Sequence, residues 1–249
     1  MVRRVRLGVI VPSSNTVLEP LTQAIVASIT DPDLEVTVHF SRLRVTKIDL
    51  SGDASLQFST EAMLAAAQLL ADAQVDVIGW SGTSAGWLGL QTDDSLCREI
   101  QKVSGIPATS SILALNELLR ASKAEKIGLV TPYLTSVVDA IRKNYAAIGF
   151  PIAPERERHL VLTKNSDFGL VTEAQLDAMV SEVANQGGAD VVAIYCTNLR
   201  GARRAAAWEK THGIVVLDSV ATTVWGMLKM VNVSPASVMG WGSIFSPQQ

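Results

Sequence analysis

The segment VRLGVIVPSSNT (residues 5–16) contains the pattern that decides the fold. It begins with β-branched and other apolar residues and passes at Pro12 into a short stretch of small polar residues. A near-continuous apolar run is typical of a strand that helices cover on both faces. The pattern recurs in LEVTVHFSRL (34–43), VDVIGW (75–80), IGLVT (127–131), ADVVAIY (189–195) and GIVVLD (213–218).

Helical patterns lie between these apolar runs. In the clearest of them, Thr172 and Gln175 have the spacing of a capping box, Leu176 and Val180 lie on one face, and a Gly-Gly pair at 187–188 ends the helix. Strands that alternate with helices predict an α/β fold with mainly parallel sheet and helices on both sides.

The chain also shows a rough internal duplication. An apolar strand that ends in small polar residues and leads into a helix occurs near 75–90 and again near 189–205. We therefore expect two pseudo-symmetric α/β lobes that face each other across a cleft. The first lobe comprises residues 1–118 and 222–249, and the second comprises residues 119–221.

Composition excludes several classes of function. The 249 residues carry a formal net charge of −3, with no long basic run, which argues against nucleic acid or a membrane surface as partner. The N-terminal apolar stretch ends at Pro12 and is too short for a signal peptide or a membrane span, so we expect a cytoplasmic protein. Two cysteines and three histidines show no metal-ligand spacing, and no metal site is expected.

Ligands of parallel α/β sheets bind at the carboxyl ends of the strands. The loops that follow four of the predicted strands are rich in hydroxyl groups and poor in charge, and they begin with PSSNT (12–16), SGTSAG (81–86), TPY (131–133) and CTN (196–198). Such loops offer N–H groups and hydroxyls to a carboxylate or an enediolate, although each one alone also fits a helix cap. No phosphate-binding or dinucleotide-binding glycine motif is present, and no nucleotide cofactor is expected.

Cys196 is the most informative single residue. It follows the run VVAIY and precedes a predicted helix, so we expect its thiol at a helix N-terminus, where the helix dipole lowers the pKa toward neutrality. Such a thiol exchanges protons efficiently. A packing role for Cys196 is the alternative, and for Cys97, within a helical pattern, packing is the expected role.

Four motifs together resemble the aspartate/glutamate racemase superfamily, in particular its maleate cis-trans isomerase and arylmalonate decarboxylase branches. They are GVIVPSSNTVLEP (8–20), WSGTSAGW (80–87), TPY (131–133) and YCTNLR (195–200). The resemblance implies two lobes, a cleft between them and no metal or organic cofactor. It also implies two facing cysteines in racemases and isomerases. Cys196 matches the second of these, whereas Gly82 stands at the first.

Glycine at the first position is similar to the arylmalonate decarboxylase branch. By that likeness we expect a decarboxylase of a small malonate-type carboxylate, in which Cys196 protonates an enediolate. The residues expected to bind the carboxylate or the oxyanion are Pro12, Asn15, Gly82, Thr83, Ser84, Tyr133 and Thr197. The alternatives are a maleate isomerase or Asp/Glu-type racemase, and a carboxylate-binding protein without catalysis. The partner is a small mono- or dicarboxylate, and a homo-oligomer is possible.

Overall fold

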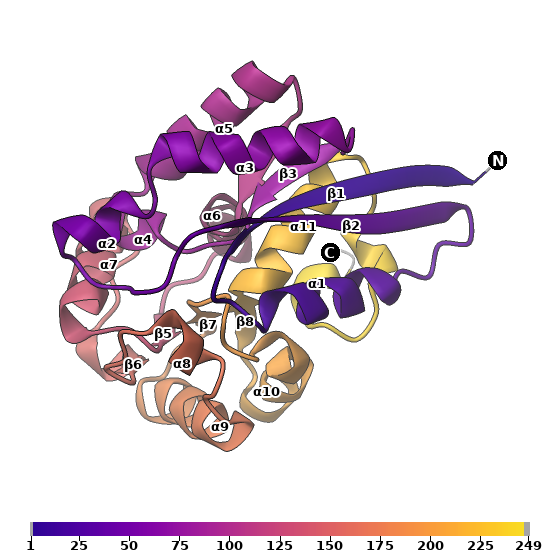
Figure 1. Cartoon of the computed structure of the whole chain (residues 1–249). Helices are drawn as coiled ribbons and strands as arrows, with labels where there is room; N and C mark the ends of the chain where they lie inside the picture. The colour runs from indigo at the N-terminus through magenta and orange to yellow at the C-terminus, as the bar shows by residue number, and fades with distance from the viewer. Residues whose placement is uncertain (1, 247–249) are drawn as a thin grey trace.

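The computed structural model describes residues 2–246, which form two parallel sheets of four strands each. The first sheet has the order β2-β1-β3-β4 and the second the order β6-β5-β7-β8, so the two halves share one topology (Figure 1). The predicted α/β class with two pseudo-symmetric sheets is confirmed. The strands are β1 (Arg3–Pro12), β2 (Leu34–Leu43), β3 (Val77–Trp80), β4 (Ala108–Ser110), β5 (Ile127–Thr131), β6 (Glu157–His159), β7 (Val191–Ile194) and β8 (Val215–Asp218).

Helices cover both faces of the first sheet. On one face α3 and α5 pack against the strands, and on the other α1 and α11 do so (Figure 1). In the second half, α9 packs on β5 and α10 on β8. The helices are α1 (Leu18–Ala27), α2 (Gly52–Leu56), α3 (Thr60–Asp72), α4 (Ala85–Leu88), α5 (Gln91–Ser104), α6 (Ser111–Ser122), α7 (Thr135–Ala147), α8 (Asn165–Phe168), α9 (Glu173–Ser181), α10 (Ala205–His212) and α11 (Ser219–Met230).

Two of the strands were not identified from the sequence. Both β4 and β6 have only three residues, and each lies at the edge of its sheet. A strand this short has no recognisable period, so the apolar pattern does not reveal it. By contrast, the predicted capping box of Thr172 and Gln175 begins α9, which continues into a π-helical turn before Gly187.

The strand register brings the predicted loops together. Ile10 on β1 pairs with Trp80 on β3, so the loops after these two strands begin side by side. Thr197, after β7, donates a hydrogen bond from Oγ1 to the Ser81 carbonyl (3.4 Å). Loops from both sheets therefore meet between the two halves of the molecule. The exact limits of the two lobes stay a prediction.

Candidate active site

A small cavity lies where these loops meet. Its volume is about 20 Å³, enough for about one water molecule. Of the site residues predicted from the sequence, all but Asn15 line it. The lining residues are Pro12, Val45, Ile48, Phe58, Trp80, Gly82, Thr83, Ser84, Trp87, Tyr133, Asn165, Cys196 and Thr197.

Cys196 lies just beyond the end of β7 at Ile194 and is 2% exposed. The prediction that it begins a helix is wrong. The chain makes a turn after Cys196, a 3-10 turn starts only at Ala202, and α10 follows at Ala205. The helix dipole therefore does not act on the thiol at close range.

The predicted lowering of the thiol pKa is wrong for the same reason. The pKa of Cys196 is raised to about 12, chiefly by burial and to a smaller extent by the carboxyl of Asp218. Hydrogen bonds from Tyr133 and from the Asn198 N–H, at 3.4 Å from Sγ, lower it but do not compensate. Cys196 is consequently a neutral thiol at pH 7, the form that can donate a proton.

Tyr133 and Thr83 form one polar pair across the two halves. Their hydroxyl oxygens lie 2.7 Å apart in a hydrogen bond. Burial raises the pKa of Tyr133 well above its usual range, and the nearby Cys196 adds to this effect. Tyr133 therefore keeps its proton and can serve as a hydrogen-bond donor beside the thiol.

Asn15 links the start of α1 to Thr197 through hydrogen bonds. Its Oδ1 accepts hydrogen bonds from the N–H groups of Val17 (3.0 Å) and Leu18 (2.9 Å) at the start of α1. Its Nδ2 donates to Thr197 Oγ1 at 3.1 Å. Asn15 therefore orients Thr197 and is not among the residues that line the cavity.

The space beside Gly82 is filled by Trp80. A Cβ atom on Gly82 would lie 2.1 Å from Cζ2 and 2.4 Å from Cε2 of the indole ring. The neighbouring hydroxyl of Ser81 does not line the cavity and lies 3.3 Å from Thr223 Oγ1. Among the residues that line the cavity, Cys196 is the only thiol.

The cavity has an aromatic wall. Phe58 contacts Trp80 (ring centroids 6.3 Å apart) and Trp87 (5.9 Å), and Trp87 contacts Tyr133 (5.2 Å), each edge to face. With Val45 and Ile48, these rings make one side of the cavity apolar and the other polar.

Asn165 is a site residue that the sequence analysis missed. It begins α8, lines the cavity and donates from Nδ2 to Ser14 Oγ at 2.9 Å. Its position after a strand could have indicated it, but that strand, β6, is too short to be recognised in the sequence.

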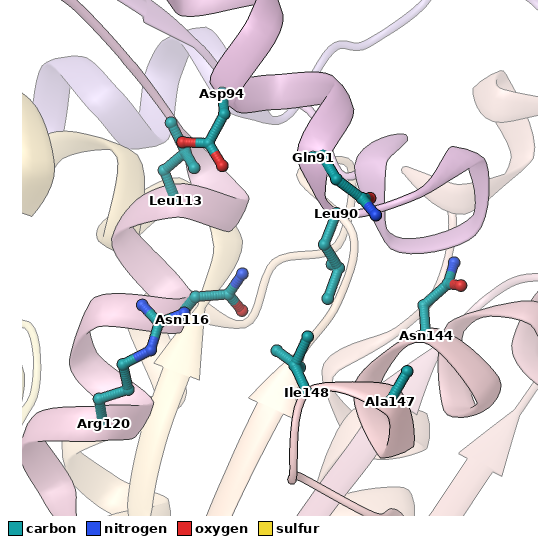
Figure 2. A pocket seen from close by; sticks show the side chains of 9 residues that line it. All are labelled: Leu90, Gln91, Asp94, Leu113, Asn116, Arg120, Asn144, Ala147 and Ile148. Carbon is teal, nitrogen blue, oxygen red and sulfur yellow. The ribbon is translucent and has the colours of Figure 1, made fainter.

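A second, larger hollow of about 300 Å³ lies between α5, α6 and α7 and is unrelated to this site. Figure 2 shows Asp94, Asn116, Arg120 and Asn144 around it. It contains no thiol and none of the predicted site residues. Within residues 2–246 no group of three or more His, Cys, Asp or Glu side chains is placed to hold a metal ion, and no helix is long and apolar enough to span a membrane.

The paired sheets and the cavity with one thiol define a two-lobed α/β protein with a cysteine site between its halves. A model of the arylmalonate decarboxylase family matches residues 8–245, and the chain belongs to that family. It is therefore an enzyme, and the proteins similar to it include decarboxylases and isomerases.

Four curated relatives are similar over most of the chain, and each is named maleate isomerase. The one from Pseudomonas putida KT2440 is 27% identical, covering 99% of both chains. Maleate isomerase of P. putida S16, solved with maleate, has a TM-score of 0.89 at 22% identity and covers 98% of both chains. A second similar structure is a liganded variant of arylmalonate decarboxylase, in which one glycine is changed to cysteine and one cysteine to serine. Its TM-score is 0.81 at 20% identity, and the match covers 97% of this chain and 98% of that one.

Proposed function

We propose that this enzyme decarboxylates a small malonate-type dicarboxylate and that Cys196 protonates the resulting enediolate. The observation that carries the proposal is the single thiol in the cavity, with Gly82 and the Trp80 ring where the first lobe would place another. The arylmalonate decarboxylase variant supports it. The glycine and cysteine replaced there are separated by as many residues as Gly82 and Cys196.

The arrangement suits each stage of this reaction. Breaking the C–C bond releases CO2 and leaves an electron pair on the α-carbon, which is delocalised into the remaining carboxylate. Hydroxyl and N–H donors of Thr83, Ser84, Tyr133 and Thr197 would stabilise that charge. The departing carboxylate would face the apolar residues Val45, Ile48, Phe58 and Trp87, which solvate a charge poorly.

Cys196 completes the reaction. Its S–H bond breaks, the proton moves to the α-carbon, and the sulfur takes up a new proton from solvent before the next turnover. Because burial keeps the thiol protonated at neutral pH, the donor is in the required state before each turnover.

Cis-trans isomerisation of a maleate-type substrate is the second candidate, and the names of all four curated relatives favour it over decarboxylation. A nucleophile would have to add to one alkene carbon, so that the C–C bond can rotate before the nucleophile leaves. In this cavity that nucleophile would be Cys196, whose raised pKa disfavours the reactive thiolate. The relatives and the geometry of the site thus favour different reactions.

One NMR experiment separates the two candidates. The purified enzyme is incubated in D2O with methylmalonate, phenylmalonate or maleate. Decarboxylation releases CO2 and gives an α-deuterated monocarboxylate, whereas isomerisation gives fumarate. We expect the first outcome, and a fall of at least about 100-fold in kcat for Cys196→Ala. Fumarate without CO2 release would select the second candidate, and full turnover in Cys196→Ala would overturn both.

A further inference from the structure

The indole N–H of Trp80 has no hydrogen-bond partner. Trp80 is fully buried, and its Nε1 is inaccessible and unpaired. A buried donor without a partner destabilises the folded protein by about 1–3 kcal/mol, and tryptophan N–H groups usually find an acceptor when buried. A polar group left in this state points to an acceptor that arrives from outside the chain.

Trp80 lies at the place where such an acceptor would bind. It ends β3 and lines the small cavity together with Gly82 and Cys196. The ring edge over Gly82 contains Cε2, the atom bonded to Nε1. The benzo edge of the indole, which adjoins the unpaired N–H at Cε2, therefore occupies the room of a side chain at position 82.

This arrangement requires glycine at position 82 because a side chain would clash there, and not because of the backbone conformation. It is not among the glycines with positive φ, so its backbone suits any residue. Only the indole ring, 2.1 Å from the position of a Cβ atom, excludes a side chain. Trp80 and Gly82 thus form one unit, in which the glycine makes room for the ring.

Several hydroxyl groups of the cavity already have partners within the protein. The hydroxyls of Tyr133 and Thr83 are hydrogen-bonded to each other, and Thr197 Oγ1 pairs with Asn15 and the Ser81 carbonyl. Trp80 Nε1 has none, so a new oxygen can take it without breaking a bond.

We propose that the indole N–H of Trp80 donates a hydrogen bond to a carboxylate oxygen of the bound substrate. This inference rests on the proposed carboxylate site. An indole N–H binds an oxygen but does not exchange its proton with carbon, so the first lobe holds the substrate and only Cys196 moves a proton. The α-carbon is consequently protonated on one face, and a prochiral malonate gives one enantiomer.

The test is a Trp80→Phe variant, which keeps an aromatic ring and removes the N–H. Its affinity for malonate and maleate is measured by calorimetry. We expect binding to weaken about 10- to 100-fold, the effect of one hydrogen bond to a charged group. Trp225→Phe is the matched control, because Trp225 lies on α11, outside the cavity, and its affinity should equal that of the wild type. Unchanged affinity in Trp80→Phe would overturn the inference.

A second measurement follows the N–H group of Trp80 itself in the wild-type protein. In the 15N-labelled wild type, the indole N–H signal of Trp80 is the one absent from Trp80→Phe, or, if that variant does not fold, from Trp80→Tyr. It should move downfield when malonate is added and stay in place with dimethyl malonate, which has no carboxylate. A signal that neither malonate nor maleate moves would overturn the inference. Neither readout requires turnover, so CO2 release and its dependence on Cys196 test the proposed function separately.

Discussion

At the scale of single residues, the contact between Gly82 and Trp80 predicts a steric penalty. A methyl group at position 82 would overlap the indole ring, so Gly82→Ala must displace Trp80 or the strand that carries it. We expect the free energy of unfolding to fall by about 1–3 kcal/mol, as is usual for overpacked sites. Urea unfolding measures it.

The control is Gly52→Ala, because a Cβ atom there would meet nothing within 4 Å. Gly52 begins α2, and alanine should leave stability unchanged or raise it slightly. If Gly82→Ala is as stable as Gly52→Ala, the indole ring does not restrict position 82 in solution.

The residues around Cys196 show how far the sequence analysis reached. Strand ends and the resemblance to the superfamily predicted Cys196, Tyr133 and Thr83, which the structure brings into one cavity. The ionisation of the thiol was not predictable in this way. Its pKa depends on burial and on hydrogen bonds from residues distant in sequence, such as Tyr133, and the local position after a strand indicates neither.

At the scale of elements, two segments close the cavity from opposite halves. Residues 46–48 and 163–165 pair as a short antiparallel bridge: the Ile48 N–H donates to the Thr163 carbonyl (2.9 Å) and the Asn165 N–H to the Thr46 carbonyl (3.0 Å). Ile48 and Asn165 also line the cavity. A cavity for about one water molecule is too small for a dicarboxylate, so we expect the bridge to separate when substrate binds.

Locking the bridge with a disulfide tests this requirement. Lys47 and Lys164 face each other between the two hydrogen bonds, and such non-hydrogen-bonded pairs have Cα atoms about 4.5 Å apart, within the range of a disulfide. In Lys47→Cys/Lys164→Cys we expect oxidation to abolish turnover and dithiothreitol to restore it.

The two single variants serve as controls, because they add a cysteine without a cross-link, and both should stay active under the same oxidant. Full activity of the cross-linked enzyme would mean that substrate reaches Cys196 by another route. This bridge was not predictable from the sequence, because its pairing joins segments more than a hundred residues apart and involves no apolar pattern.

At the scale of the whole molecule, the two halves enclose two buried carboxyl groups. Burial raises the pKa of Asp93, in the first turn of α5, from 3.8 to about 7, and that of Asp218, which caps α11, also to about 7. In the unfolded chain both would ionise near pH 4. Between about pH 4 and pH 7 these two groups therefore hold more protons in the folded protein than in the unfolded chain.

This difference sets the sign of the pH dependence. Stability falls with rising pH wherever the folded state binds more protons, so these two groups favour the folded state at pH 4 and lose that contribution by pH 7. Each unit of pKa corresponds to about 1.4 kcal/mol.

Asp93→Asn removes one of the two groups without touching the cavity, so the midpoint of thermal unfolding should fall less between pH 4.5 and pH 7.5 than in the wild type. Asp72→Asn removes an exposed carboxylate at the end of α3 and should keep the slope of the wild type. If Asp93→Asn keeps it as well, Asp93 is ionised in the folded protein and its burial is compensated by groups that move toward it.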